Sequence, residues 1–230
     1  MVAVGGIEVI ALPIKDPMRA TPKAKAPTPS ALRAARVAAE KAASRNPKQL
    51  ATTDGELDVS LPAWAGFRSR ASDKPSKGRV RISVGGDGMI SGDGEITAEH
   101  RAAYRHVLDH SEAMQGVILA AIIAEYPRIR AVFDGSSVAM PAAVDAASLR
   151  ELVELTSVAI HHAHADGVAY VGYSLACAWD REHALGLMTH RERVVEVGGA
   201  DTAILGWIAT SDQKKRAGAA SKAKRQRPRR

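Results

Sequence analysis

Aromatic residues, cysteine and long apolar runs are all scarce in this sequence. Only three Trp, four Tyr and two Phe occur among 230 residues, too few for a nucleic-acid surface that stacks many bases on rings. The single cysteine, Cys177, excludes an intrachain disulfide framework and a zinc site made of cysteines alone. The longest apolar run, residues 117–124, falls far short of the ~20 residues that cross a bilayer. We therefore expect a soluble cytoplasmic protein that does not contact membranes.

The net charge of +7 conceals opposite charges in different parts of the chain. Residues 51–210 contain 21 Asp and Glu against 14 Lys and Arg, whereas residues 211–230 contain nine Lys and Arg against one Asp. Residues 1–50 are also basic and are rich in proline and alanine. Because large apolar side chains are scarce at both ends, we predict one folded domain over 51–210, between a basic N-terminal extension (1–50) and a basic disordered tail (211–230).

Hydrophobic periodicity predicts both strands and helices. Residues 56–61 and 79–84 alternate polar and apolar side chains, which indicates two half-buried strands, the first ended by Pro62. Apolar side chains then recur at helical spacing behind Thr97, a plausible N-cap, as far as Pro127. A break near residues 109–111 would divide this stretch into two helices.

The C-terminal third predicts two hairpins. Asp166-Gly167 is a strong two-residue turn signal, and a type I′ turn there would pair Ile160 with Tyr173 and bury the face that ends at Cys177. Further strands are expected over 185–190 and 194–198, and then a short terminal helix over 201–208 that docks Ile204, Leu205 and Trp207. The predicted fold class is α+β: an antiparallel sheet of two N-terminal strands and a four-strand C-terminal meander, with a helical hairpin between them and a short terminal helix.

The loop between the two hairpins carries the residue types of a metal site or an acid/base pair. These are Asp180, Glu182 and His183, to which His162 and His164 on a neighbouring strand are the obvious additional metal ligands. The alternative is a loop that caps the sheet, with Trp179 buried and the carboxylates accepting backbone hydrogen bonds. We favour the alternative, so these five residues remain weak candidates, no catalytic or metal-binding residue is assigned, and no cofactor is expected.

Two other patterns are weaker. His106 and His110 are four residues apart and could share a metal ion. No acidic residue or cysteine clearly falls on the same helix face, so we expect solvated helix histidines. The glycines between residues 85 and 94 lack the lysine-serine/threonine pair of a phosphate-binding loop, so we expect a turn.

Three segments together resemble an uncharacterised bacterial family, a domain of unknown function. They are residues 169–173, 177–186 and 193–202, of which the middle one contains Trp179-Asp180-Arg181-Glu182-His183-Ala184 where the family has Trp-Asp-x-Glu-His-Gly. Residues 61–67 and 96–99 match its N-terminal half, so the resemblance covers about 54–210. It implies an α+β fold and no established activity. If the family's glycine needs a positive φ, Ala184 costs about 1 kcal/mol here.

Three functions are compatible with these observations. The leading one is a small interaction protein, accessory or immunity-like, whose acidic domain binds a basic protein partner. Its rival is a metal-dependent or acid/base enzyme that uses Asp180, Glu182 and His183. The weakest is non-specific nucleic-acid association through the basic ends, chiefly residues 211–230. The sequence favours a binding protein over an enzyme.

Overall fold

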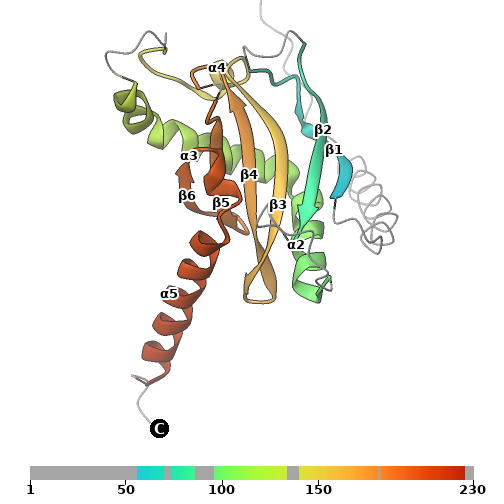
Figure 1. The fold of residues 1–230 in the computed structure, drawn as a ribbon, viewed down its shortest axis with the longest axis vertical. Coiled ribbons are helices and arrows are strands. Elements are labelled where there is room, and N and C mark those ends of the chain that lie inside the picture. The colour runs from blue at the N-terminus through green and yellow to red at the C-terminus, as the bar shows by residue number, and fades with distance from the viewer. Residues whose placement is uncertain (1–55, 70–73, 86–95, 134–139, 181, 226–230) are drawn as a thin grey trace, which may run out of the picture. The chain divides into compact units, whose positions relative to one another are not determined.

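The computed structural model describes residues 56–69, 74–85, 96–133, 140–180 and 182–225, so the extension expected over 1–50 lies outside the described residues (Figure 1). In this part of the chain, six strands form one sheet in the order of the sequence. The strands are β1 (Glu56–Ala65), β2 (Lys77–Val84), β3 (Val153–Ala165), β4 (Val168–Cys177), β5 (Leu185–His190) and β6 (Arg193–Gly198). The helices are α2 (Ala98–Asp109), α3 (Ser111–Val132), α4 (Ala146–Leu149), the 3-10 helix η2 (Ala200–Ala203) and α5 (Gly206–Arg225).

The sheet is mixed, which corrects the expected antiparallel arrangement. β3 to β6 form the predicted antiparallel meander, and β1 pairs antiparallel with β2, but β2 and β3 run parallel. The physical reason is the connection between β2 and β3, which contains α2, α3 and α4. A connection of this length returns the chain to the same end of the sheet, as a parallel pair requires. The α+β class is confirmed.

Helices α2 and α3 cover one face of the sheet. Thr97 is the N-cap of α2, as predicted, and its backbone N–H donates to Nδ1 of His100 at 3.1 Å. The chain bends by 85° at the predicted break between α2 and α3. α3 contacts β1 and β6, at opposite edges of the sheet, because its 22 residues span about 33 Å. The large core of the protein lies between these helices and the sheet.

The prediction that Pro127 ends the long helix is wrong, because α3 continues to Val132. Tyr126 is buried before the proline and Ile129 packs against the core after it. Arg128 also donates to the carbonyl of Val197 on β6 at 3.1 Å. Tertiary contacts therefore hold the last turn in spite of the backbone donor that proline lacks.

Near its turn, the β3–β4 hairpin has the predicted register. Asp166 and Gly167 have φ values of 48° and 74°, as a type I′ turn requires, and Ala165 pairs with Val168. Beyond a bulge after residue 160, however, Ile160 pairs with Val171 and not with the predicted Tyr173. The bulge moves the register by two residues, which leaves every side chain on its predicted face. The six side chains expected in the core are all buried: Val158, Ile160, Val171, Tyr173, Leu175 and Cys177.

The other face of the sheet is covered by η2 and by the start of α5. A Cβ atom on Gly172 would lie 1.7 Å from the carbonyl oxygen of Ala203, so only glycine allows η2 to approach this closely. Gly186 on β5 and Gly198 on β6 are also crowded, because a Cβ atom would lie 2.3 Å from the carbonyl oxygen of Gly199 and 2.4 Å from the Thr202 hydroxyl. A small second core lies on this face and consists of Tyr170, Met188, Ile208 and Ala209.

The C-terminal region differs from its prediction. The expected single helix over 201–208 is η2 followed by α5, which continues to Arg225 through a segment whose composition indicates disorder. Of the three predicted docking residues, Leu205 packs against the second core beside the buried Ile208 and Ala209, whereas Ile204 and Trp207 are 40% and 61% exposed. Figure 1 shows the second half of α5 projecting away from the sheet.

Polar contacts to the hairpins explain the order in the first half of α5. The hydroxyl of Tyr170 donates to Asp212 at 2.6 Å, the amide of Gln213 donates to the carbonyl of His164 at 2.7 Å, and Arg216 pairs with Asp166. A sequence rule based on apolar burial does not detect such contacts.

The capping-box pattern of residues 148–151 predicts a short helix through Leu155, but helix α4 begins earlier and ends at Leu149. Its N-cap is Asp145, whose carboxylate accepts from the backbone N–H of Ser148 at 2.7 Å, and residues 153–155 belong to β3 and not to a helix. None of the described helices is by itself long and apolar enough to cross a membrane, and α2 and α3 pass such a test only as a bent pair.

Candidate functional site

The loop after β4 has the form of a sheet cap. Trp179 is only 4% exposed, and its ring meets that of Tyr126 edge to face with centroids 5.7 Å apart. Oδ1 of Asp180 accepts from the backbone N–H groups of Glu182 at 3.2 Å and His183 at 2.8 Å, and it lies 3.2 Å from Nδ1 of His183. Cys177 donates through Sγ to the carbonyl of Asp180 at 3.3 Å. These contacts close the turn on itself.

This geometry leaves little for catalysis. One oxygen of Asp180 is occupied by the turn, and the side chain of His183 is 76% exposed. Glu182 is also exposed, and water weakens electrostatic interactions between exposed groups. The loop therefore brings two of the three sequence candidates, Asp180 and His183, into contact, but in the manner of a cap.

Ala184 ends this loop in a left-handed conformation, with φ at 53°. Its N–H donates to the carbonyl of Asp180 at 3.2 Å, and the carbonyl of His183 accepts from Ala200 at 2.8 Å. These bonds join the loop to η2. The position therefore has a positive φ, which glycine would adopt without strain and alanine adopts at a cost of about 1 kcal/mol.

His162 and His164 lie far from that loop. Val153, at the start of β3, pairs with Cys177 beside the loop, whereas His164 lies near the opposite end of the strand. Nine residues of strand separate Val153 from His162, or roughly 30 Å. One ion therefore cannot bind both sets of residues. His162 instead packs against the ring of His100, with centroids 5.0 Å apart.

A groove of about 380 Å³ lies between β3 and α5. Its rim carries Trp207, the most exposed aromatic side chain of the described residues, and the exposed Lys214. Its base includes the buried His161, whose Nε2 lies 2.9 Å from the carbonyl of Ala203. The lining residues are His161, His162, Ala163, Gly206, Trp207, Thr210, Ser211 and Lys214. Sequence reasoning missed this groove because it placed Trp207 in the core.

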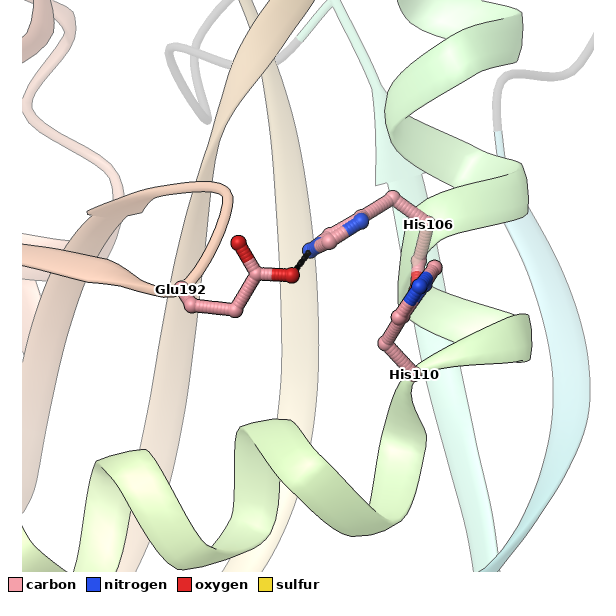
Figure 2. Close-up of side chains that lie close together, drawn as sticks. All are labelled: His106, His110 and Glu192. Carbon is pink, nitrogen blue, oxygen red and sulfur yellow. Dashed lines mark hydrogen bonds and ion pairs between the residues drawn. The ribbon is translucent and has the colours of Figure 1, made fainter.

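His106 of α2, His110 at the bend between α2 and α3, and Glu192 of the β5–β6 turn form a third cluster (Figure 2). Nε2 of His106 lies 3.6 Å from Oε1 of Glu192, and the rings of His106 and His110 stack with centroids 4.4 Å apart. Burial, and then the charge of His110, lower the pKa of His106, against the opposing effect of Glu192. The sequence predicted solvated histidines because this carboxylate comes from a distant turn.

One comparison with known proteins gives a match. The family model described as Domain of unknown function (DUF6985) matches residues 54–205. No curated protein and no solved structure matches the chain. The expectation of an uncharacterised domain family is therefore confirmed, and its residue range agrees with the predicted one.

Proposed function

We propose that this chain, which belongs to the DUF6985 family, is a bacterial cytoplasmic protein with an accessory or immunity-like role, and that it binds a protein partner at the groove beside Trp207. The observation that carries the proposal is the 61% exposure of Trp207 at the rim of a preformed groove. A tryptophan that stays exposed next to a groove gains binding energy when a partner covers it, and tryptophan is enriched among the residues that dominate interface energies.

The groove is rigid enough to serve as an interface. Both its walls belong to regular elements, β3 and α5. The contacts of Asp212, Gln213 and Arg216 hold α5 against the hairpins within ten residues of Trp207. Binding of a partner here causes only a small loss of conformational entropy in this surface, which favours affinity.

Charge defines the kind of partner. The acidic composition of residues 51–210 led us to expect a basic partner, but the groove itself carries His162 and Lys214, and α5 continues with Lys215 and Lys222. This surface suits a partner that presents an apolar side chain to Trp207, with carboxylates beside it. For this surface we therefore propose an acidic partner in place of the basic partner that the composition led us to expect.

The enzymatic alternative has no comparable support. Asp180 closes a turn, and Glu182 and His183 are exposed, so the three do not form an enclosed acid/base set. Nucleic-acid association remains a second candidate, because the projecting half of α5 is basic.

Site-specific photo-crosslinking tests the proposal. A photoreactive phenylalanine analogue replaces Trp207 in the full chain, expressed in the source organism, and the matched control carries it in place of Val132, which is 75% exposed on α3. We expect one protein to crosslink from position 207 and not from 132. The purified partner should then bind the Trp207→Ser variant at least tenfold more weakly, with the melting temperature of the chain unchanged.

Two results would contradict the proposal. One is an identical set of crosslinked proteins from positions 207 and 132. The other is unchanged affinity of the partner for Trp207→Ser, which would place the interface elsewhere.

A further inference from the structure

Two imidazoles and one carboxylate converge at a pocket of about 470 Å³ beside α2 (Figure 2). His106 lies in the last turn of α2, and His110 is the C-cap residue of that helix, where its ring stacks on that of His106. Glu192 comes from the two-residue turn between β5 and β6, where Arg191 has a φ of 53°. One donor atom from each residue lies within 4.8 Å of the other two.

The ring of His106 presents an unused nitrogen to this cluster. Its Nε2 is enclosed and makes no hydrogen bond to any of the described residues. Oε1 of Glu192, at 3.6 Å, is too far away to form one. An enclosed nitrogen that faces a carboxylate across a gap is costly unless something lies between them, and a cation between the two atoms would satisfy both.

The hydrogen bond of His110 favours the tautomer that a metal ligand needs. Nδ1 of His110 lies 3.3 Å from the carbonyl of His106, and because a carbonyl only accepts, Nδ1 carries the hydrogen in this contact. In the neutral ring, Nε2 then holds the free lone pair. A backbone carbonyl that orients the ring in this way is the usual outer contact of a metal-bound histidine.

We propose that His106, His110 and Glu192 bind a divalent transition-metal ion of the zinc class, with water or an anion in the fourth position. Tetrahedral zinc with bonds of about 2.0–2.1 Å holds its ligand atoms roughly 3.3–3.4 Å apart, so these atoms need to close by only about 1.5 Å or less. Glu192 is exposed, so its side chain has room to turn inward. Two nitrogen donors exclude a calcium- or magnesium-type site, which takes oxygen ligands.

The charged residues that line the rest of the pocket influence which fourth ligand the metal ion would carry. Arg105 and Arg191 line it together with Asp109. Arg191 donates to the carbonyl of Asp166 at 3.0 Å, which keeps its guanidinium near the site. Two guanidinium groups weaken the attraction for a bare cation and favour a metal ion that carries an anionic fourth ligand.

Metal titration of the untagged full chain tests the site. The protein is stripped with a chelator and titrated with Zn²⁺ in a calorimeter, and with Co²⁺ while its visible absorption is recorded. His110→Ala and Glu192→Gln remove one ligand each at exposed positions, and the matched controls are His164→Ala and Glu182→Gln, which are also exposed. Circular dichroism melts of the metal-free proteins verify that all four variants fold.

We expect one zinc ion per chain and the visible bands of tetrahedral Co²⁺. Zinc affinity should fall at least about tenfold in His110→Ala and in Glu192→Gln and stay unchanged in both controls, since loss even of outer contacts costs 10–100-fold. Zinc should also raise the melting temperature of the parent chain more than that of the two ligand variants. Absence of saturable binding, equal affinity in parent and ligand variants, or an equal loss in His164→Ala would each overturn the proposal.

Discussion

The hydroxyl of Tyr170 on β4 donates a 2.6 Å hydrogen bond to Oδ2 of Asp212 on α5. Arg193 on β6 pairs with the same carboxylate, so one acidic side chain connects α5 to two strands. Burial alone would raise the pKa of Asp212, but hydrogen bonds from Arg193 and Tyr170 and the charges of Arg193 and Arg216 outweigh it and lower the pKa below its ordinary 3.8. This connection holds the wall of the groove that carries Trp207.

Replacement of Asp212 should release α5. Asp212→Ala leaves the Tyr170 hydroxyl and Arg193 without their charged partner, and we expect a loss of about 2–3 kcal/mol in the free energy of unfolding. Hydrogen exchange in residues 206–216 should accelerate, while the exposed Lys215→Ala control stays like the parent. Because the folded pKa is depressed, this stabilisation is present above pH 3.8 and is lost as the pH falls below it. Unchanged exchange in α5 would show that other contacts suffice.

The close packing of η2 on the sheet predicts a severe effect at Gly172. Gly172→Ala places Cβ 1.7 Å from the backbone oxygen of Ala203, which no side-chain rotation relieves, so unfolding should become easier by at least about 3 kcal/mol. Gly116→Ala on α3 is the control, because nothing lies within 4 Å of its Cβ, and it should stabilise the protein by about 1 kcal/mol. Urea denaturation measures both. Similar stability in the two variants would refute the packing of η2.

Ala184 offers the opposite case. Ala184→Gly relieves about 1 kcal/mol of strain at φ 53° but makes the unfolded chain more flexible, and we expect a net gain of at most about 0.5 kcal/mol. Ala176→Gly in β4 relieves no such strain and should lose about 1 kcal/mol. Thermal melts of both variants give the comparison, and a loss at both positions would mean that the strain is negligible.

His100 should make stability depend on pH. Burial, and then the charge of His162, lower its pKa below 6.5, so the folded state resists protonation. Stability is therefore intact above pH 6.5 and falls as the pH drops from there towards the lower folded pKa. His100→Gln keeps a side chain that can accept from Thr97 at the same capping position and does not titrate. Urea midpoints between pH 7.5 and 5 should decline less in this variant, and parallel declines would disprove the assignment.

Nucleic-acid binding, if it uses α5, should be weak, indifferent to sequence and sensitive to salt. Six Lys and Arg follow Arg216, beyond the last contact described between α5 and the hairpins. Truncation after Arg216 should therefore leave the fold intact. It should also reduce the slope of the logarithm of the nucleic-acid affinity against the logarithm of the salt concentration. Titrations with unrelated duplexes at several salt concentrations measure this slope. A strong preference for one duplex, or unchanged binding by the truncated chain, would refute a role for this segment.

Features that depend on near neighbours could be predicted from the sequence. Thr97 caps its helix through a residue three positions away, and Asp166-Gly167 forms the expected hairpin turn. The alternation from Val171 to Cys177 identified the buried face, and its continuation placed Trp179 in the core. Each of these depends on local backbone preference or on a period of two, which the order of residues contains directly.

Contacts between distant segments decided the rest. The parallel pairing of β2 with β3, the helical turn beyond Pro127 and the order of α5 up to Arg216 all depend on partners that no local pattern specifies. The candidate sites follow the same rule. Asp180, Glu182 and His183 have the residue types of a reactive site, and the fold adds hydrogen bonds from the backbone N–H groups of Glu182 and His183 to Asp180. His106 and His110 lacked an acidic partner until the β5–β6 turn brought Glu192 beside them, because proximity in a fold is set by packing energy and not by distance along the chain.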